Sequence, residues 1–147
     1  MKHPHLPTLN KKQTGSSLIE VLIAMVVLGI GILGLLALQA TALKTNQLAL
    51  TRTQASELAS EISELMRANR VAAEDGQYDT GLTDTASSAT SIAENDVKTW
   101  KSHLAQLPVG QGSISHNGDI FTIIVQWDES RLKNGNSQQQ FVYKTGL

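Results

Sequence analysis

The sequence predicts an α+β fold, in which a long N-terminal helix packs against a small antiparallel β-sheet. Three observations favour this class. Val21 to Leu38 are 18 residues without a charged or hydrogen-bonding side chain. Gln39 to Arg70 contain no proline and no glycine, and their apolar residues recur at helical spacing. The C-terminal third alternates with a period of two and contains two Asn-Gly pairs, which are typical of hairpin turns.

The apolar run Val21–Leu38 has nearly the length that a membrane-spanning helix needs. About 20 residues at roughly 1.5 Å per residue cross a hydrocarbon core of about 30 Å. We therefore expect a transmembrane segment at about residues 18–38. Lys11 and Lys12 flank it and place its N-terminal end in the cytoplasm by the positive-inside rule. Residues beyond 40 then lie on the other side of the membrane.

A polar, basic leader precedes the apolar run, MKHPHLPTLNKKQTG, and it contains no apolar segment of its own. Residues 11–21 (KKQTGSSLIEV) resemble the prepilin cleavage motif of type IV pilins and their relatives. The resemblance implies that a prepilin peptidase cuts between Gly15 and Ser16 and that Ser16 is then N-methylated. It also makes Glu20 the glutamate found at the fifth position of mature pilins. The family usually has phenylalanine where this chain has Ser16.

Glu20 stands at the edge of the apolar run, where a carboxylate needs a partner. Burial of a charge at mid-membrane costs about 2.5–3.5 kcal/mol, and less near the interface. Cleavage after Gly15 would create an amine on Ser16, one helical turn from Glu20. This amine, or that of a neighbouring subunit, could neutralise the carboxylate during assembly. A simple favourable interaction with the helix dipole is the alternative.

The helical pattern continues beyond the span. We expect one continuous helix from Ser16 to Arg70, of 55 residues and about 80 Å. A coiled coil is the alternative, but the apolar stripe is short for one. The leader (residues 1–15), this helix (16–70) and a head (71–147) are the expected divisions of the chain. The apolar stripe that should pack on the head consists of Leu48, Ala55, Leu58, Ile62 and Leu65.

In the head, residues 71–95 read as a loop, followed by a short helix capped by Asn95 or Asp96. Its apolar face is Val97, Trp100, Leu104 and Leu107. Strands are expected at residues 113–116, 119–127 and 138–143, with turns at Asn117-Gly118 and Asn134-Gly135. The strand side chains expected to face the long helix are Phe121, Ile123, Val125 and Trp127.

Composition and motifs exclude several classes of function. Twelve basic residues balance 13 acidic ones, so no nucleic-acid partner is expected. The absence of cysteine excludes disulfides and thiolate ligands. His103 is expected to face solvent, and the pairs Glu57/Glu61 and Asp128/Glu129 read as solvated carboxylates. The sequence thus predicts no catalytic, cofactor or metal site, and no enzyme.

A second set of residues resembles minor pilins: the run 66–70, Trp100, Leu107-Pro108 and the strand end Val125–Trp127. The resemblance implies a single-pass inner-membrane protein with a periplasmic head that joins a surface pilus, a filament used for adhesion and twitching motility. The implied partners are prepilin peptidase, other minor pilins, the major pilin, a tip adhesin, the inner-membrane assembly platform and the lipid bilayer. A minor pseudopilin of a type II secretion system, and an uncleaved, signal-anchored periplasmic binding domain, are the alternatives.

Overall fold

The computed structural model describes residues 17–85, 90–130 and 137–147. The chain divides into two compact units, one up to Thr41 and one from Ala42 to Leu147, which are described in turn. The elements follow in the order α1 (Leu18–Ala68), α2 (Arg70–Glu74), α3 (Ile92–Leu104), β1 (Gln111–Asn117), β2 (Ile120–Asp128) and β3 (Gln138–Gly146).

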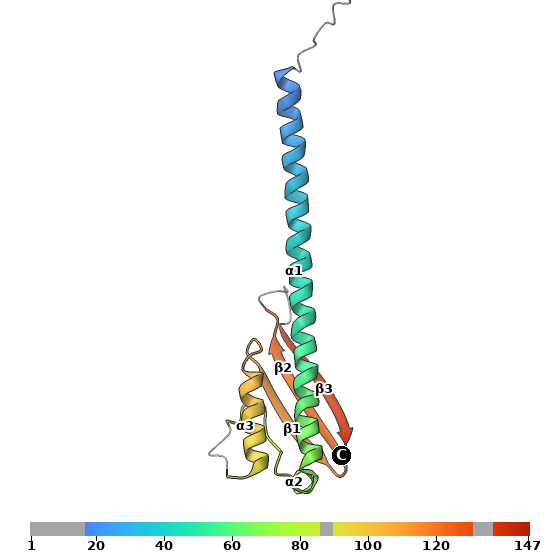
Figure 1. Ribbon diagram of the computed structural model, residues 1–147, viewed down its shortest axis with the longest axis vertical. Coiled ribbons are helices and arrows are strands. Elements are labelled where there is room, and N and C mark those ends of the chain that lie inside the picture. Colours follow the sequence, from blue (N-terminus) through green and yellow to red (C-terminus); the bar gives the residue numbers. More distant parts are fainter. Residues whose placement is uncertain (1–16, 86–89, 131–136) are drawn as a thin grey trace, which may run out of the picture. The chain divides into compact units, whose positions relative to one another are not determined.

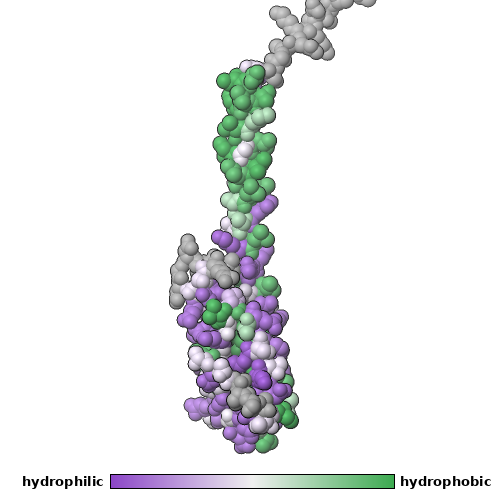
Figure 2. Space-filling view, turned by 90° about the vertical axis from the view of Figure 1, so that its left-hand side faces the viewer, coloured by the Kyte–Doolittle hydropathy of each residue, from purple (hydrophilic) through white to green (hydrophobic). Residues whose placement is uncertain are grey.

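The described part of the first unit is mainly the apolar part of α1. Its side chains are exposed on every side of the helix, from Val21 at 45% to Leu38 at 70%. Figure 2 shows this part as an almost unbroken apolar surface, in contrast to the mostly polar surface of the second unit. A helix that is apolar all round needs lipid or other helices around it.

In the second unit, α1 packs against the sheet through small side chains. Ala55, Ala59, Ile62 and Met66 are fully buried, whereas Leu58 and Leu65 lie at the margin of the core. The predicted stripe is therefore rotated slightly from the observed one. The buried face of α1 thus combines two alanines with Ile62 and Met66, and the two leucines lie beside this face.

The long helix ends earlier than predicted. α1 stops at Ala68, and the backbone N–H of Asn69 is shared between the carbonyl groups of Leu65 and Met66, at 3.1 and 3.2 Å. The short helix α2 follows directly and buries Ala72 and Ala73. The prediction of a loop from residue 71 is therefore wrong for residues 71–74, which belong to α2.

The sheet has three antiparallel strands in the order β1-β2-β3 (Figure 1). The β1–β2 turn is Gly118-Asp119, one residue later than predicted, since Asn117 pairs with Ile120. Gly118 has a φ of 59° and Asp119 has no positive φ, the pattern of a type II′ turn. β3 extends to Gly146, beyond the predicted end at residue 143. The predicted turn at Asn134-Gly135 lies outside the described residues.

The core lies between the sheet and the helices α1 and α3. The four side chains predicted to face the helix, Phe121, Ile123, Val125 and Trp127, are all buried. From α3, Trp100 and Leu104 are fully buried, and the Trp100 Nε1–H donates to the backbone carbonyl of Leu58 at 2.9 Å. The α+β class is confirmed, and the architecture is consistent with a type IV pilin-like fold.

The start of α3 differs from the prediction. The N-cap is Ser91, not Asn95 or Asp96, and it forms a capping box with Glu94. The Ser91 hydroxyl accepts from the Glu94 N–H at 3.2 Å, and the Glu94 carboxylate accepts from the Ser91 N–H at 3.1 Å. The N-terminal amides of α3 are thus hydrogen-bonded at Ser91, four residues before Asn95, the first of the two predicted caps.

Candidate functional site

The N-terminal assembly segment is described only in part. Gly15 and Ser16, the predicted cleavage and methylation residues, lie outside the described residues. Glu20 lies in the first turn of α1 and is exposed. Its carboxylate accepts a hydrogen bond from the backbone N–H of Ser17 at 3.2 Å. An acid in this position complements the helix dipole, but a neutral N–H does not cancel its charge.

Downstream of Glu20, α1 is long and apolar enough to cross a membrane, judged by length and composition alone. Gly29, Gly31 and Gly34 lie within this part, and a methyl group added at any of them would meet no atom within 4 Å. In this unit the glycines therefore make no close contact of their own. They leave shallow places on the helix surface, which is how small residues let helices approach one another in lipid.

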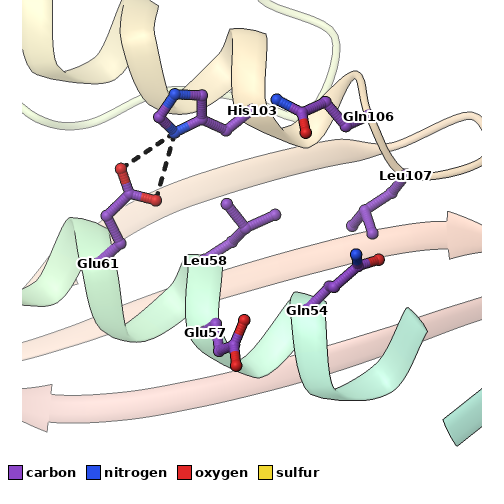
Figure 3. A pocket seen from close by; sticks show the side chains of 7 residues that line it. All are labelled: Gln54, Glu57, Leu58, Glu61, His103, Gln106 and Leu107. Carbon is purple, nitrogen blue, oxygen red and sulfur yellow. Dashed lines mark hydrogen bonds and ion pairs between the residues drawn. The ribbon is translucent and has the colours of Figure 1, made fainter. Parts of the chain in front are cut away.

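The head carries a groove between α1 and the C-terminal end of α3, with a volume of about 410 Å³ (Figure 3). Leu58 and Leu107 supply its apolar lining, and Gln54, Glu57 and Gln106 its polar rim. His103 was predicted to face solvent and Glu61 to be a solvated carboxylate. Instead, His103 Nδ1 lies 3.0 Å from Glu61 Oε1, and both side chains are half-buried. The pair joins α3 to α1.

Glu129 was also predicted to be solvated, and this prediction is wrong. Its side chain is 1% exposed, and Oε1 accepts from Trp127 Nε1–H at 3.0 Å. Arg52 Nε lies 3.4 Å from the same oxygen, so the carboxylate links the end of β2 to α1. Oε2 has no partner among the described residues. The described contacts of this buried carboxylate therefore all fall on Oε1.

Two further polar side chains hold the segment between α2 and α3. Tyr78 is fully buried, and its hydroxyl donates to Asp96 Oδ2 at 2.7 Å and accepts from Asn69 at 3.3 Å. Lys101 Nζ donates to the carbonyl groups of Gly81 and Gly112, at 2.5 and 2.7 Å. Burial lowers the pKa of the Lys101 amine, and the nearby Asp84 carboxylate opposes that shift. These contacts join the segment between α2 and α3 to the rest of the head.

Among residues 17–85, 90–130 and 137–147, no group of three or more histidine, aspartate or glutamate side chains could hold a metal ion. The polar pairs of the head each join two elements. The capping box was detectable in the sequence as Ser91-x-x-Glu94. The burial of Tyr78 and Glu129 had no local signal, because their partners Asp96 and Arg52 are distant in the chain.

Comparison with protein-family models matches residues 10–36 to the prokaryotic N-terminal methylation motif. No curated protein and no solved structure matches the chain. The matched range contains Gly15, Ser16 and Glu20 and most of the apolar run. Together, the motif and the exposed apolar helix indicate a membrane-anchored protein. The N-terminal methylation motif indicates a type IV pilin-like or pseudopilin protein.

Proposed function

We propose that this protein is a minor pilin resembling PilV. It is processed at Gly15, held in the inner membrane by residues 18–38, and joined with other minor pilins in a complex that primes a type IV pilus at its tip. The observation that carries the proposal is the combination of the Gly15-Ser16 motif, Glu20 and an exposed apolar helix that follows the cut. In this proposal the chain divides into a leader (1–15), an N-terminal helical segment (16–70, in which α1 ends at Ala68) and a periplasmic head (71–147).

The mechanism is helix packing. In the membrane, lipid covers the apolar side chains of α1; in the pilus, the corresponding helices of neighbouring subunits cover them. Glu20 then enters an apolar bundle, where its charge needs a cationic partner. The Ser17 N–H satisfies one oxygen without cancelling the charge. The methylated amine of Ser16, from the same or a neighbouring subunit, supplies the positive charge.

The mature N-terminus tests the processing step. Intact mass spectrometry of the membrane-purified protein should show loss of residues 1–15 and one added methyl group. The control is the same chain in cells lacking prepilin peptidase, where the full mass is expected. A full-length mass in cells that contain the peptidase would overturn the proposal and favour the uncleaved, signal-anchored binding domain.

The substitution Glu20→Ala tests the assembly step. We expect normal cleavage, because the glycine and its neighbours are unchanged, and few or no pili by electron microscopy. Glu64→Ala is the matched control, since Glu64 is an exposed carboxylate on the same helix that pairs with Arg67 three residues away. Normal numbers of pili with Glu20→Ala would show that assembly does not require the negative charge of Glu20.

A type II secretion pseudopilin is the second candidate, because the methylation motif is common to both classes. The match ends at residue 36, so the distinction depends on the head. Deletion of the gene, followed by counts of surface pili and assay of secreted protein, separates the two. Lost pili with intact secretion support the minor pilin, and the reverse result supports the pseudopilin.

A further inference from the structure

β3 forms one edge of the sheet, and its outer side pairs with no described residue. It lies beside β2 alone, at the margin opposite β1 (Figure 1). The β1 edge, in contrast, has a pairing partner, because Thr80 and Ile114 exchange two backbone hydrogen bonds, each of 2.9 Å. The carbonyl group of Gly112 in β1 also accepts a hydrogen bond from Lys101 Nζ at 2.7 Å. One edge of the sheet is covered, and the other is open.

The register shows which backbone groups the open edge presents. The Glu129 N–H donates to the Ser137 carbonyl at 2.7 Å, so these opposed residues form a hydrogen-bonded pair. Such pairs alternate along an antiparallel ladder, which directs the amides of Phe141 and Tyr143 toward β2. The residues between them direct their N–H and C=O groups outward. The outward-facing residues are Gln138, Gln140, Val142, Lys144 and Gly146.

This edge lacks the features that normally protect a strand from pairing. β3 has nine residues, no proline and an uninterrupted register with β2, and Lys144 is its one charged side chain. On the core side of the sheet, Phe141 and Tyr143 pack against the core but are only partly buried. An additional strand would satisfy the outward backbone groups and also cover these two rings.

A second copy of this chain fits the edge poorly. Pairing of β3 with β1 of another copy is blocked, because Thr80 occupies the β1 edge at Ile114. Pairing of two β3 strands would bring no acidic side chain to Lys144, because β3 has no acidic residue. The occupant is therefore a different protein, and its identity as a neighbouring pilus subunit rests on the proposed function.

We propose that the outer edge of β3 binds an extended segment of a different protein by β-strand addition. Main-chain hydrogen bonds supply the affinity, and alternate side chains supply the specificity. Opposite Phe141 and Tyr143 the segment carries apolar side chains, since such cross-strand pairs are favourable. On the other face it carries an acidic side chain near Lys144. The partner is an amphipathic, acidic β-strand, such as the sheet edge of a neighbouring pilus subunit.

Amide hydrogen exchange on the full chain in detergent micelles tests whether the edge is open. The amides of Gln140, Val142 and Lys144 should exchange roughly tenfold or more faster than those of Phe141 and Tyr143, because only the latter are bonded within the sheet. Equal protection of both sets in a monomeric chain would show that the edge is already covered and would overturn the proposal.

Cross-linking in cells tests the partner. A photoreactive residue is placed at Gln138 in one strain and at Gln140 in another, and the products are mapped by mass spectrometry. Because paired strands advance together, the two cross-links should fall about two residues apart in one segment of a different protein. Cross-links to a second copy of this chain, or to scattered sites, would overturn the proposal.

Val142→Pro removes one outward N–H that no described residue uses, and edge strands tolerate proline there. We expect the cross-link yield to fall about tenfold, while Val142→Thr, which retains the N–H, keeps it. An unchanged yield with Val142→Pro would overturn the proposal. If Val142→Pro does not fold, Lys144→Glu replaces it, and reversal of the charge should lower the yield. Leader retention would refute the proposed function but leave the exchange result unaffected.

Discussion

Tyr78 joins three parts of the head through one hydroxyl group. The hydroxyl lies between Asn69, at the end of α1, and Asp96 in α3, and the ring is fully buried. Burial, assisted by the bond to Asp96, raises the pKa of Tyr78 from 10.0 to about 12. The folded chain therefore favours the neutral phenol more strongly than the unfolded chain does.

This pKa predicts a loss of stability in alkali. The contribution of Tyr78 is fully present below pH 10.0, the unfolded value, and is lost as the pH rises toward about 12. Urea unfolding at several pH values in this window should show the free energy of unfolding falling more steeply in the natural chain than in Tyr78→Phe. Tyr143→Phe is the control, since it leaves Tyr78 in place and should keep the steep fall. Equal slopes in all three chains would contradict the prediction.

Glu129 gives a second prediction at this scale. Glu129→Ala should lower the free energy of unfolding by about 1–3 kcal/mol, because it leaves the buried Trp127 N–H without an acceptor. Glu129→Gln should cost less, since its amide oxygen can still accept that bond. Chemical denaturation of the three chains measures the difference. Equal losses in both variants would assign the effect to the carboxylate charge and its ion pair with Arg52, which both variants remove, and not to the hydrogen bond from Trp127.

At the scale of elements, the N-cap residue Ser91 determines where α3 begins. Ser91 and Glu94 pair reciprocally, and two bonds from Thr90 to the same carboxylate, at 2.6 and 2.8 Å, strengthen the arrangement. These bonds, with that from Ser91, lower the pKa of Glu94. The start of the helix is thus fixed by hydrogen bonds within its own local sequence.

Ser91→Ala should lower the free energy of unfolding by about 1 kcal/mol, the usual loss for an N-cap. Asn95→Ala is the matched control, because Asn95 was the cap predicted from the sequence but lies exposed inside α3. We expect its effect to be close to zero. Thermal unfolding of both variants checks the assignment, and a larger loss with Asn95→Ala would contradict it.

The elements that the sequence predicts well have a regular pattern of their own. β2 alternates strictly between buried and partly exposed residues, so its inner face could be assigned in full. The face of α1 was assigned less accurately, because leucines dominate the hydrophobic pattern whereas Ala59 and Met66, which the prediction left out, are fully buried. The burial of Glu129 depends on Trp127 and on Arg52, 77 residues away, and no local pattern contains that contact.

At the scale of the whole molecule, the buried hydrophobic side chains of the described residues belong to the second unit, from Ala55 onward. A chain that begins at Ala42 should therefore fold in aqueous buffer without detergent and unfold in one cooperative transition. Circular dichroism during urea titration measures this, with the full chain in detergent as the control. Aggregation, or a gradual loss of signal, would contradict it.

The candidate site could be predicted only at its N-terminal end. Glu20 was placed correctly at the helix start because a charge beside an apolar run is conspicuous in any sequence. The open edge of β3 could not be predicted, since whether an edge is covered depends on where Thr80 and α3 lie in three dimensions.

The apolar run of α1 is slightly shorter than a bilayer is thick. Its 18 residues extend about 27 Å, compared with a hydrocarbon core of about 30 Å. A span of this length needs no tilt, and the lipid around it must thin or its flanking residues must reach outward, at fractions of a kcal/mol per Å. Transfer of the helix from lipid into a bundle of other helices removes this mismatch. In a pilus subunit, a short span would therefore favour departure from the membrane.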